Sequence, residues 1–150
     1  SIIKLGFPDM KLDTVPQCEV SESMSNVIIK YKPEIIFTHN AHDLNKDHRI
    51  VFEATLVAIR PQNFFPRRVY SYEVLSSTEW ASGEAFVPDH FVDIRDFIDL
   101  KKEAFAAMKT EVRKYPHPRS LEGIETLARF RGMQCGFNFA EAFKLIRSYE

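Results

Sequence analysis

Residues 33–49 read PEIIFTHNAHDLNKDHR, and this stretch decides the fold. Its apolar run at 35–37 is short and unbroken, which is typical of a strand that is buried on both faces of a parallel sheet. The polar residues 39–46 follow as a loop, and apolar residues then recur through 47–59 at the spacing of a helix. A strand, a loop and a helix in this order predict an α/β layered sheet.

The sequence on either side continues the alternation of helices and strands. Pro33 ends a helix that we expect over 21–31, because the residue before a proline is restricted away from helical backbone. Apolar residues recur most regularly over 97–112, which predicts a helix with one wide apolar face. A further helix is expected over 121–131, with Ser120 as its N-cap. Strands are expected over 69–74, 91–94 and 139–146, where the last segment could also form a helix, and a long loop is expected over 76–88.

The composition is that of an ordinary globular domain, and it argues against several classes of function. Of the 150 residues, 45% are hydrophobic and 27% are charged, and the net charge is −1. The basic residues are not clustered and no apolar run reaches the length of a membrane span, so we expect neither nucleic-acid binding nor a membrane span. Cys18 and Cys135 lack a CxxC spacing and are expected to be unpaired thiols in a reducing cytoplasm.

The loop after the first quoted strand holds an unusual concentration of imidazoles. Three of the five histidines, His39, His42 and His48, lie within ten residues. Open α/β sheets bind ligands at the carboxyl ends of their strands, and imidazole with carboxylate suits a divalent transition metal, usually Zn²⁺. His48 would lie in the first turn of the following helix. Asp47 beside it would be ionised near the helix N-terminus and could orient an imidazole.

A plainer interpretation of the same loop stays open. Asp43 or Asn45 could simply cap the helix, and His39 could be hydrogen-bonded to backbone. A catalytic zinc takes about three protein ligands and a water. The spacing selects only His48 as a strong ligand, so the pattern alone does not define a complete metal site.

Residues 41–49, AHDLNKDHR, resemble the segment P-H-D-x-H-P-D-H-R of the LmbE-like deacetylases, the PIG-L family. Further segments that look like parts of this family are spread over nearly the whole chain. They are LGFPD (5–9), LD (12–13), SSTEW (76–80), FVDI (91–94), HPRS (117–120), LARFRG (127–132) and AEAF (140–143).

The resemblance implies a Rossmann-like three-layer α/β/α sandwich with a mostly parallel sheet, as one partial domain over 1–150. The family's first motif, A-H-P-D-D-E, supplies the other metal ligands and the general base, and residues 1–150 contain no such segment. We therefore expect the motif upstream, so that the sheet here would lack its N-terminal strand and helix. The resemblance implies activity for the complete protein and leaves open whether these residues alone are active.

The implied activity is a zinc-dependent hydrolase that removes acetyl from an N-acetylglucosamine-type sugar or glycoconjugate in the cytoplasm. Fe²⁺ stays open as the metal, and a homo-oligomer as the assembly. In this family the metal polarises the amide carbonyl and activates a water, and a carboxylate acts as general base. Two alternatives remain, namely a metal amidase with a non-sugar substrate and a non-catalytic sugar-binding or scaffold relative.

Site residues carry over from the family by position. His48 is the expected metal ligand, and Asp47 is the adjacent acidic group of the catalytic set. Asn45 stands where many members have a histidine that stabilises the oxyanion, and asparagine can donate a neutral hydrogen bond but cannot supply a proton. The expected substrate contacts are His42, Asp43 and Arg119, the last toward a phosphate or carboxylate, with a helix-end contact as the alternative for Arg119.

Overall fold

The computed structural model describes residues 2–61 and 64–150, and its strands form one four-stranded sheet. The strands lie in the spatial order β1-β2-β4-β3, and only the β1–β2 pairing is parallel in this sheet. The α/β class is confirmed, as is the final strand, but the expectation of a mostly parallel sheet holds only loosely, because β1, β2 and β3 run in one direction while β4 is antiparallel to both of its neighbours. The helix between β1 and β2 returns the chain to the start of the neighbouring strand, as parallel pairing requires, whereas the chain enters β4 from the end at which β2 and β3 finish. The strands are β1 (Ile35–Thr38), β2 (Arg68–Tyr72), β3 (His90–Asp93) and β4 (Ala140–Ser148).

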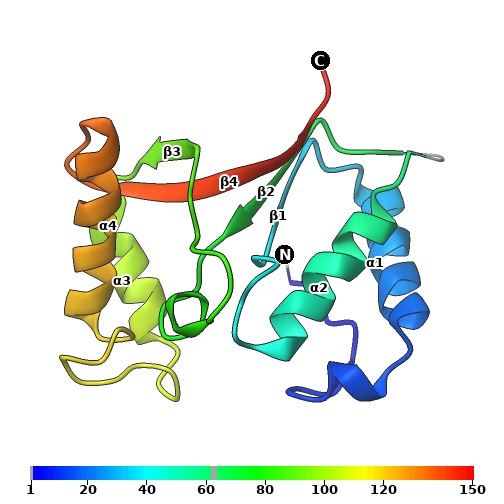
Figure 1. Ribbon diagram of the computed structural model, residues 1–150, viewed down its shortest axis with the longest axis horizontal. Coiled ribbons are helices and arrows are strands. Elements are labelled where there is room, and N and C mark those ends of the chain that lie inside the picture. Colours follow the sequence, from blue (N-terminus) through cyan, green and yellow to red (C-terminus); the bar gives the residue numbers. More distant parts are fainter. Residues whose placement is uncertain (1, 62–63) are drawn as a thin grey trace.

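The helices flank the sheet in two pairs (Figure 1). α1 (Gln17–Tyr31) and α2 (Lys46–Ala58) pack together beside β1 and β2, and α3 (Ile98–Ala106) and α4 (Leu121–Cys135) lie beside β3 and β4. Two short 3₁₀ turns, Leu12–Thr14 and Thr78–Trp80, lie in the connections. One apolar cluster, centred on Leu12, Val20 and Ala54, joins the two helices to the segment that precedes them. A second, centred on Ile28, Ile59 and Val69, joins the helix pair to the strands.

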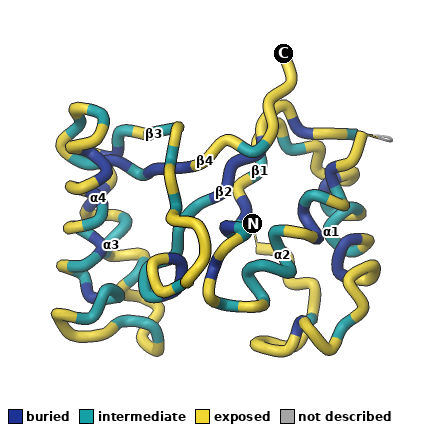
Figure 2. The backbone as a smooth tube through the Cα atoms, in the orientation of Figure 1, coloured by how far each residue is buried: buried dark blue, intermediate teal, exposed yellow. Residues whose placement is uncertain are grey.

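One aromatic ring from each strand joins a row that crosses the whole sheet. Phe37 of β1 stacks on Tyr70 of β2 with ring centroids 5.6 Å apart, and Tyr70 stacks on His90 of β3 at 4.5 Å. Phe143 of β4 lies 4.8 Å from the Phe37 ring. Each such pair adds about 0.5–1.5 kcal/mol beyond its buried area, so the row helps to fix the strand register near the carboxyl end of β1. The buried stretches of backbone accordingly run along β2 and the first part of β4 (Figure 2).

α3 is shorter than predicted, and part of its apolar face is exposed. It ends at Ala106, and residues 107–112 form turns in which Met108 N–H donates to Phe105 O and Glu111 N–H to Met108 O, three residues back rather than four. Ile98 is buried as expected, but Leu100 is 61% and Met108 49% exposed. The periodicity therefore identified the helix but misassigned one of its apolar rows to the core.

α4 begins and ends with the caps that its sequence indicates. Ser120 is fully buried, and its side-chain oxygen accepts a hydrogen bond from Gly123 N–H at 2.9 Å, which confirms the predicted N-cap. The helix extends beyond the predicted end at 131, because the left-handed residue Gly136 (φ 83°) caps it. The segment before Ser120 packs closely on the first turn, since a Cβ on Gly123 would lie 2.2 Å from the Pro118 carbonyl oxygen.

We expect Gly123→Ala to destabilise the protein, although alanine is normally the better helix former by about 1 kcal/mol. The added methyl group would collide with backbone, so the free energy of unfolding should fall by about 2 kcal/mol in urea titrations. Thr126→Ala, at an exposed position of the same helix, should change it by less than about 1 kcal/mol. A Gly123→Ala protein as stable as the native one would refute the close contact.

Two further sequence predictions concern cysteines and membranes. Cys18 and Cys135 are free thiols, as expected. None of the helices in the described part of the chain combines the length and the apolarity needed to cross a bilayer.

Candidate functional site

Asp43 is the buried centre of the loop between β1 and α2. Asp43 is 1% exposed, and both of its carboxylate oxygens accept hydrogen bonds. The Asn45 N–H donates to Oδ1 at 2.9 Å, and the Ser77 hydroxyl donates to the same oxygen. The Thr78 hydroxyl donates to Oδ2 at 2.7 Å. Burial by itself raises the pKa of Asp43, but these hydrogen bonds outweigh it and lower the pKa, so that the group is ionised at neutral pH.

This carboxylate also holds His48, whose side chain is 20% exposed. His48 Nδ1 lies 3.0 Å from Asp43 Oδ1. A carboxylate can only accept, so Nδ1 carries the hydrogen and the lone pair of the neutral ring is on Nε2. Metal-binding histidines commonly have this arrangement, because a carboxylate on one nitrogen fixes the tautomer and orients the other toward the ion.

The partner predicted for this imidazole was wrong. Asp47 Oδ1 accepts a hydrogen bond from Leu12 N–H at 3.1 Å, and it is Asp43 that orients His48. Neighbouring residues of a helix project about 100° apart, so Asp47 and His48 face different parts of the molecule. Asp47 ties the first turn of α2 to the 3₁₀ turn that begins at Leu12.

His39, at the end of β1, stacks on His48. The two rings are parallel to within 3°, with centroids 3.9 Å apart. Burial first, and then the nearby His48, lower the pKa of His39 to about 4, against a smaller opposite effect of Asp43. Tyr72 OH lies 3.4 Å from His39 Nε2, while Nδ1 is buried with no partner among the described residues. His39 is therefore a neutral ring that supports the His48 face.

The lowered pKa of His39 predicts an acid-sensitive fold. Between pH 6.5 and pH 4 the unfolded chain binds a proton at this residue that the folded chain excludes, so stability falls as the pH falls through this window. In the metal-free protein, the urea midpoint of His39→Gln should change less between pH 6.5 and pH 4 than that of the native protein. His42→Gln, at an exposed histidine, should keep it. An unchanged dependence of stability on pH in His39→Gln would contradict this assignment. Protonation of Asp43 does not account for the change, because it affects stability only below the ordinary pKa of 3.8.

Asn45 caps α2, as the plainer interpretation of the loop predicted. Its Oδ1 accepts a hydrogen bond from Asp47 N–H at 2.9 Å. The other end of the same amide, Nδ2, faces Met10 Sδ at 3.5 Å. A thioether is a weak acceptor, so this N–H pair remains available to a better one.

Asn45 and His48 line a cavity of about 860 Å³. Arg119 lines it too, which brings the two most distant parts of the predicted site together. Arg119 is not free, however, because it forms an ion pair with Glu111 and donates to the Leu75 carbonyl oxygen at 3.2 Å. These partners lie in the loop after β2 and in the turns after α3, so the side chain is neither a free surface charge nor part of a contact at a helix end, and its substrate contact stays a prediction. The other lining residues are Asp9, Met10, Glu73, Val74, Leu75, Lys101, Ala104, Phe105, Met108, Glu111, Ile124 and Leu127.

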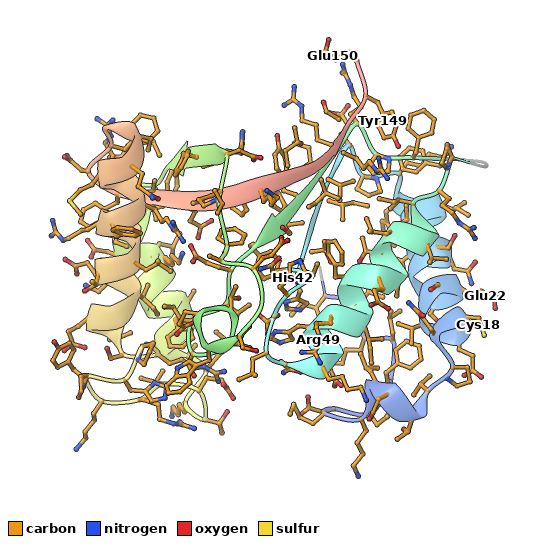
Figure 3. The ribbon with its side chains drawn as sticks, in the orientation of Figure 1. Cys18, Glu22, His42, Arg49, Tyr149 and Glu150 are labelled. Atoms are coloured by element: carbon orange, nitrogen blue, oxygen red, sulfur yellow. The ribbon has the colours of Figure 1, made fainter. Side chains whose placement is uncertain are left out.

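Two of the expected substrate contacts lie away from this lining. The His42 side chain is 49% exposed, beside Gly83, and its Nε2 lies 3.6 Å from Glu84 Oε2 (Figure 3). Asp43 is enclosed by its own hydrogen bonds, so its geometry suits positioning His48 rather than touching a ligand.

Sequence reasoning missed three residues that build the site. Arg49, labelled in Figure 3, donates to the Asp43 and Leu44 carbonyl oxygens at 2.6 and 2.7 Å and so fastens the loop. Ser77 and Thr78 complete the buried network. The signal for all three was present, since they lie in the segments 41–49 and 76–80 that resemble the family, but nothing local in the sequence indicated their contacts.

The donor set fits one metal ligand rather than a full site. His48 Nε2 has the required orientation, with its ring held by a buried carboxylate. Over residues 2–61 and 64–150 there is no group of three or more His, Cys, Asp or Glu side chains that could hold an ion.

Comparison with known proteins finds one family model that matches part of the chain. The model of the PIG-L family, described as GlcNAc-PI de-N-acetylase, matches residues 1–59, which include the whole His39–His48 loop. The predicted resemblance to PIG-L is confirmed. The match extends from the N-terminal segment to α2 and thus contains Asn45, Asp47 and His48. Comparison with curated proteins gives no match.

Two solved structures share the fold. A conserved protein from Thermus thermophilus is 22% identical, with a TM-score of 0.75 over 97% of this chain. The N,N'-diacetylchitobiose deacetylase from Pyrococcus horikoshii is 19% identical, with a TM-score of 0.72 over 95% of this chain. The α/β fold is therefore that of longer proteins, of which the chain spans 65% and 55% respectively.

Proposed function

We propose that this chain forms part of a metal-dependent hydrolase that removes acetyl from an N-acetylated amino sugar. The observation that carries the proposal is the imidazole of His48, which is fixed by the buried Asp43 and lines a large cavity next to Asn45. The description of the PIG-L family as a de-N-acetylase supports it, as does the deacetylase whose fold is similar.

His48 would hold the ion through Nε2. A bound Zn²⁺ or Fe²⁺ supplies Lewis-acid polarisation of the amide carbonyl. The described residues offer one oriented ligand, so the proposed site needs ligands beyond them. Within the chain, Asp43 keeps His48 in the tautomer that leaves Nε2 unprotonated, and the stacked His39 is neutral and adds no positive charge beside the ion.

Asn45 would stabilise the oxyanion of the tetrahedral intermediate through Nδ2, while its Oδ1 stays bound to the Asp47 N–H. Asn45→Asp separates these two functions, because aspartate also caps a helix but offers no N–H. In the metal-loaded protein we expect it to lower kcat about 100-fold, with unchanged metal content and thermal stability. Asn45→Ala should in addition cost about 1 kcal/mol of stability through the lost cap. Native turnover in Asn45→Asp would end the oxyanion assignment.

One assay separates this function from its alternatives. Acetate release is measured from the methyl glycoside of N-acetylglucosamine and from an N-acetyl amino acid, after loading with Zn²⁺ or Fe²⁺. Release from the sugar supports the proposal, and release from the amino acid alone supports a non-sugar amidase. Binding of the sugar without release from either would indicate a non-catalytic relative.

A further inference from the structure

The wall of the cavity supplied by α3, by the turns after it and by α4 is mostly apolar. Its apolar residues are Ala104, Phe105, Met108, Ile124 and Leu127, with Lys101 and Glu111 as the charged ones, whereas the polar Asn45 and His48 come from the start of α2. A volume of about 860 Å³ lies in the range of cavities that take drug-sized ligands. A sugar ring beside Asn45 and His48 would therefore leave room for a substituent of similar size.

The apolar surface continues out of the cavity along α3. Leu100 lies one turn before Ala104 on α3, so these two share one row, and Met108 lies in the turns that follow the helix. Leu100 is 61% exposed, and Phe97, at the start of the helix, is 59% exposed. A contiguous apolar row that leads from a cavity is the surface that an extended apolar ligand group would cover.

The charged groups of the lining do not suit an anion. Both of its cations are already paired, Lys101 with Glu141 at 2.6 Å and Arg119 with Glu111. Glu73 is held by Arg131 at 2.7 Å, in a pair whose side chains are 16% and 9% exposed. With Asp9 included, the side chains of the lining are three carboxylates and two cations, so a phosphate or carboxylate placed away from the ion on His48 would have to break an existing pair to bind a cation.

We infer that the cavity selects an uncharged amino sugar that bears an alkyl substituent, and that the substituent lies against α3 and α4. This inference rests on the proposed function, and it adds to it the class of substrate. The substituent could be a long N-acyl chain or an alkyl aglycone, because either can lie beside the amide. The same apolar wall would recognise both.

Binding of defined glycosides to the protein tests this inference. The reference probe is the methyl glycoside of N-acetylglucosamine, and it is compared with its octyl glycoside, with the methyl glycoside of N-octanoylglucosamine and with N-acetylglucosamine 1-phosphate. At least one octyl-bearing probe should bind about tenfold or more tightly than the reference, since every buried methylene adds to affinity. The phosphate should bind no more tightly than the reference. The octyl arm that gains affinity identifies the position of the substituent.

Two variants locate the effect. Met108→Glu should remove the preference for octyl, which is measured within the variant as the ratio of its affinities for the octyl and methyl probes. Met133→Glu is the matched control, because Met133 is a 73% exposed methionine of α4 outside the lining, and it should keep the preference. Equal affinities for the methyl and octyl probes, preferred binding of the phosphate, or an octyl preference that survives Met108→Glu would each overturn the inference.

A last probe separates this inference from the proposed function. Octyl glucoside lacks the acetamido group. If it bound as tightly as the octyl glycoside of N-acetylglucosamine and no acetate were released from any probe, the apolar wall would stand and the deacetylase proposal would fail. If the methyl glycoside were deacetylated and the octyl groups brought no gain in affinity, the deacetylase would stand and the inference would fail.

Discussion

Asp43→Ala is expected to lower the free energy of unfolding by about 3–5 kcal/mol, because it removes the acceptor of an enclosed network. Four donors use this carboxylate, namely the hydroxyls of Ser77 and Thr78, the Asn45 N–H and the His48 ring. In the alanine variant all four would lose this acceptor, and the hydroxyls of Ser77 and Thr78 would be buried without one. A loss of this size is a large fraction of the stability of an ordinary domain.

Urea titration with two further variants distinguishes the network from a general effect of removing an acid. Asp13→Ala removes an exposed carboxylate that pairs with Lys46 at 3.0 Å, and it should cost less than about 1 kcal/mol. Ser77→Ala should cost an intermediate amount, about 1–2 kcal/mol, because one hydrogen bond to the carboxylate is lost. If Asp43→Ala matched Asp13→Ala, the carboxylate would not hold the loop together.

The elements with strong local signals could be predicted from the sequence. β1 and α2 were found because an unbroken apolar run, a polar loop and a helical repeat follow one another within thirty residues, and Ser120 was found because a cap is a local interaction. α3 shows the limit of such signals. Its repeat marked a helix, but which apolar row is covered depends on the neighbouring elements, and Leu100 and Met108 stay exposed to solvent.

The contacts of the site needed the tertiary structure. Asp43 meets Ser77 and Thr78 across 34 and 35 residues of sequence, and only the placement of β2 next to β1 brings them together. The direction of β4 is likewise set by where the chain leaves α4 rather than by its own composition. The residue types of the loop could therefore indicate a metal, whereas the partner of His48 could not be chosen between Asp43 and Asp47.

The largest effect on function is expected from His48→Ala. If Nε2 is a ligand, its loss removes one of about three protein ligands, and metal affinity should fall by more than the 10- to 100-fold that a change in a supporting residue brings. Asp43→Asn should show the smaller loss of metal affinity, about 10- to 100-fold, because the His48 ring would remain but Nδ1 would have a weaker partner. Metal affinity is measured by competition with a chromophoric chelator, and deacetylation by acetate release.

His42→Ala is the matched control, because it removes an imidazole from the same loop that does not line the cavity. It should leave both metal affinity and acetate release unchanged, which would show that the cluster of histidines acts through one ring and not through its total charge. Unchanged zinc stoichiometry in His48→Ala would instead remove this residue from the ligand set. The hydrogen bond between His48 and Asp43 would then serve only the structure of the loop, because orienting the His48 ring affects catalysis only if Nε2 binds the ion.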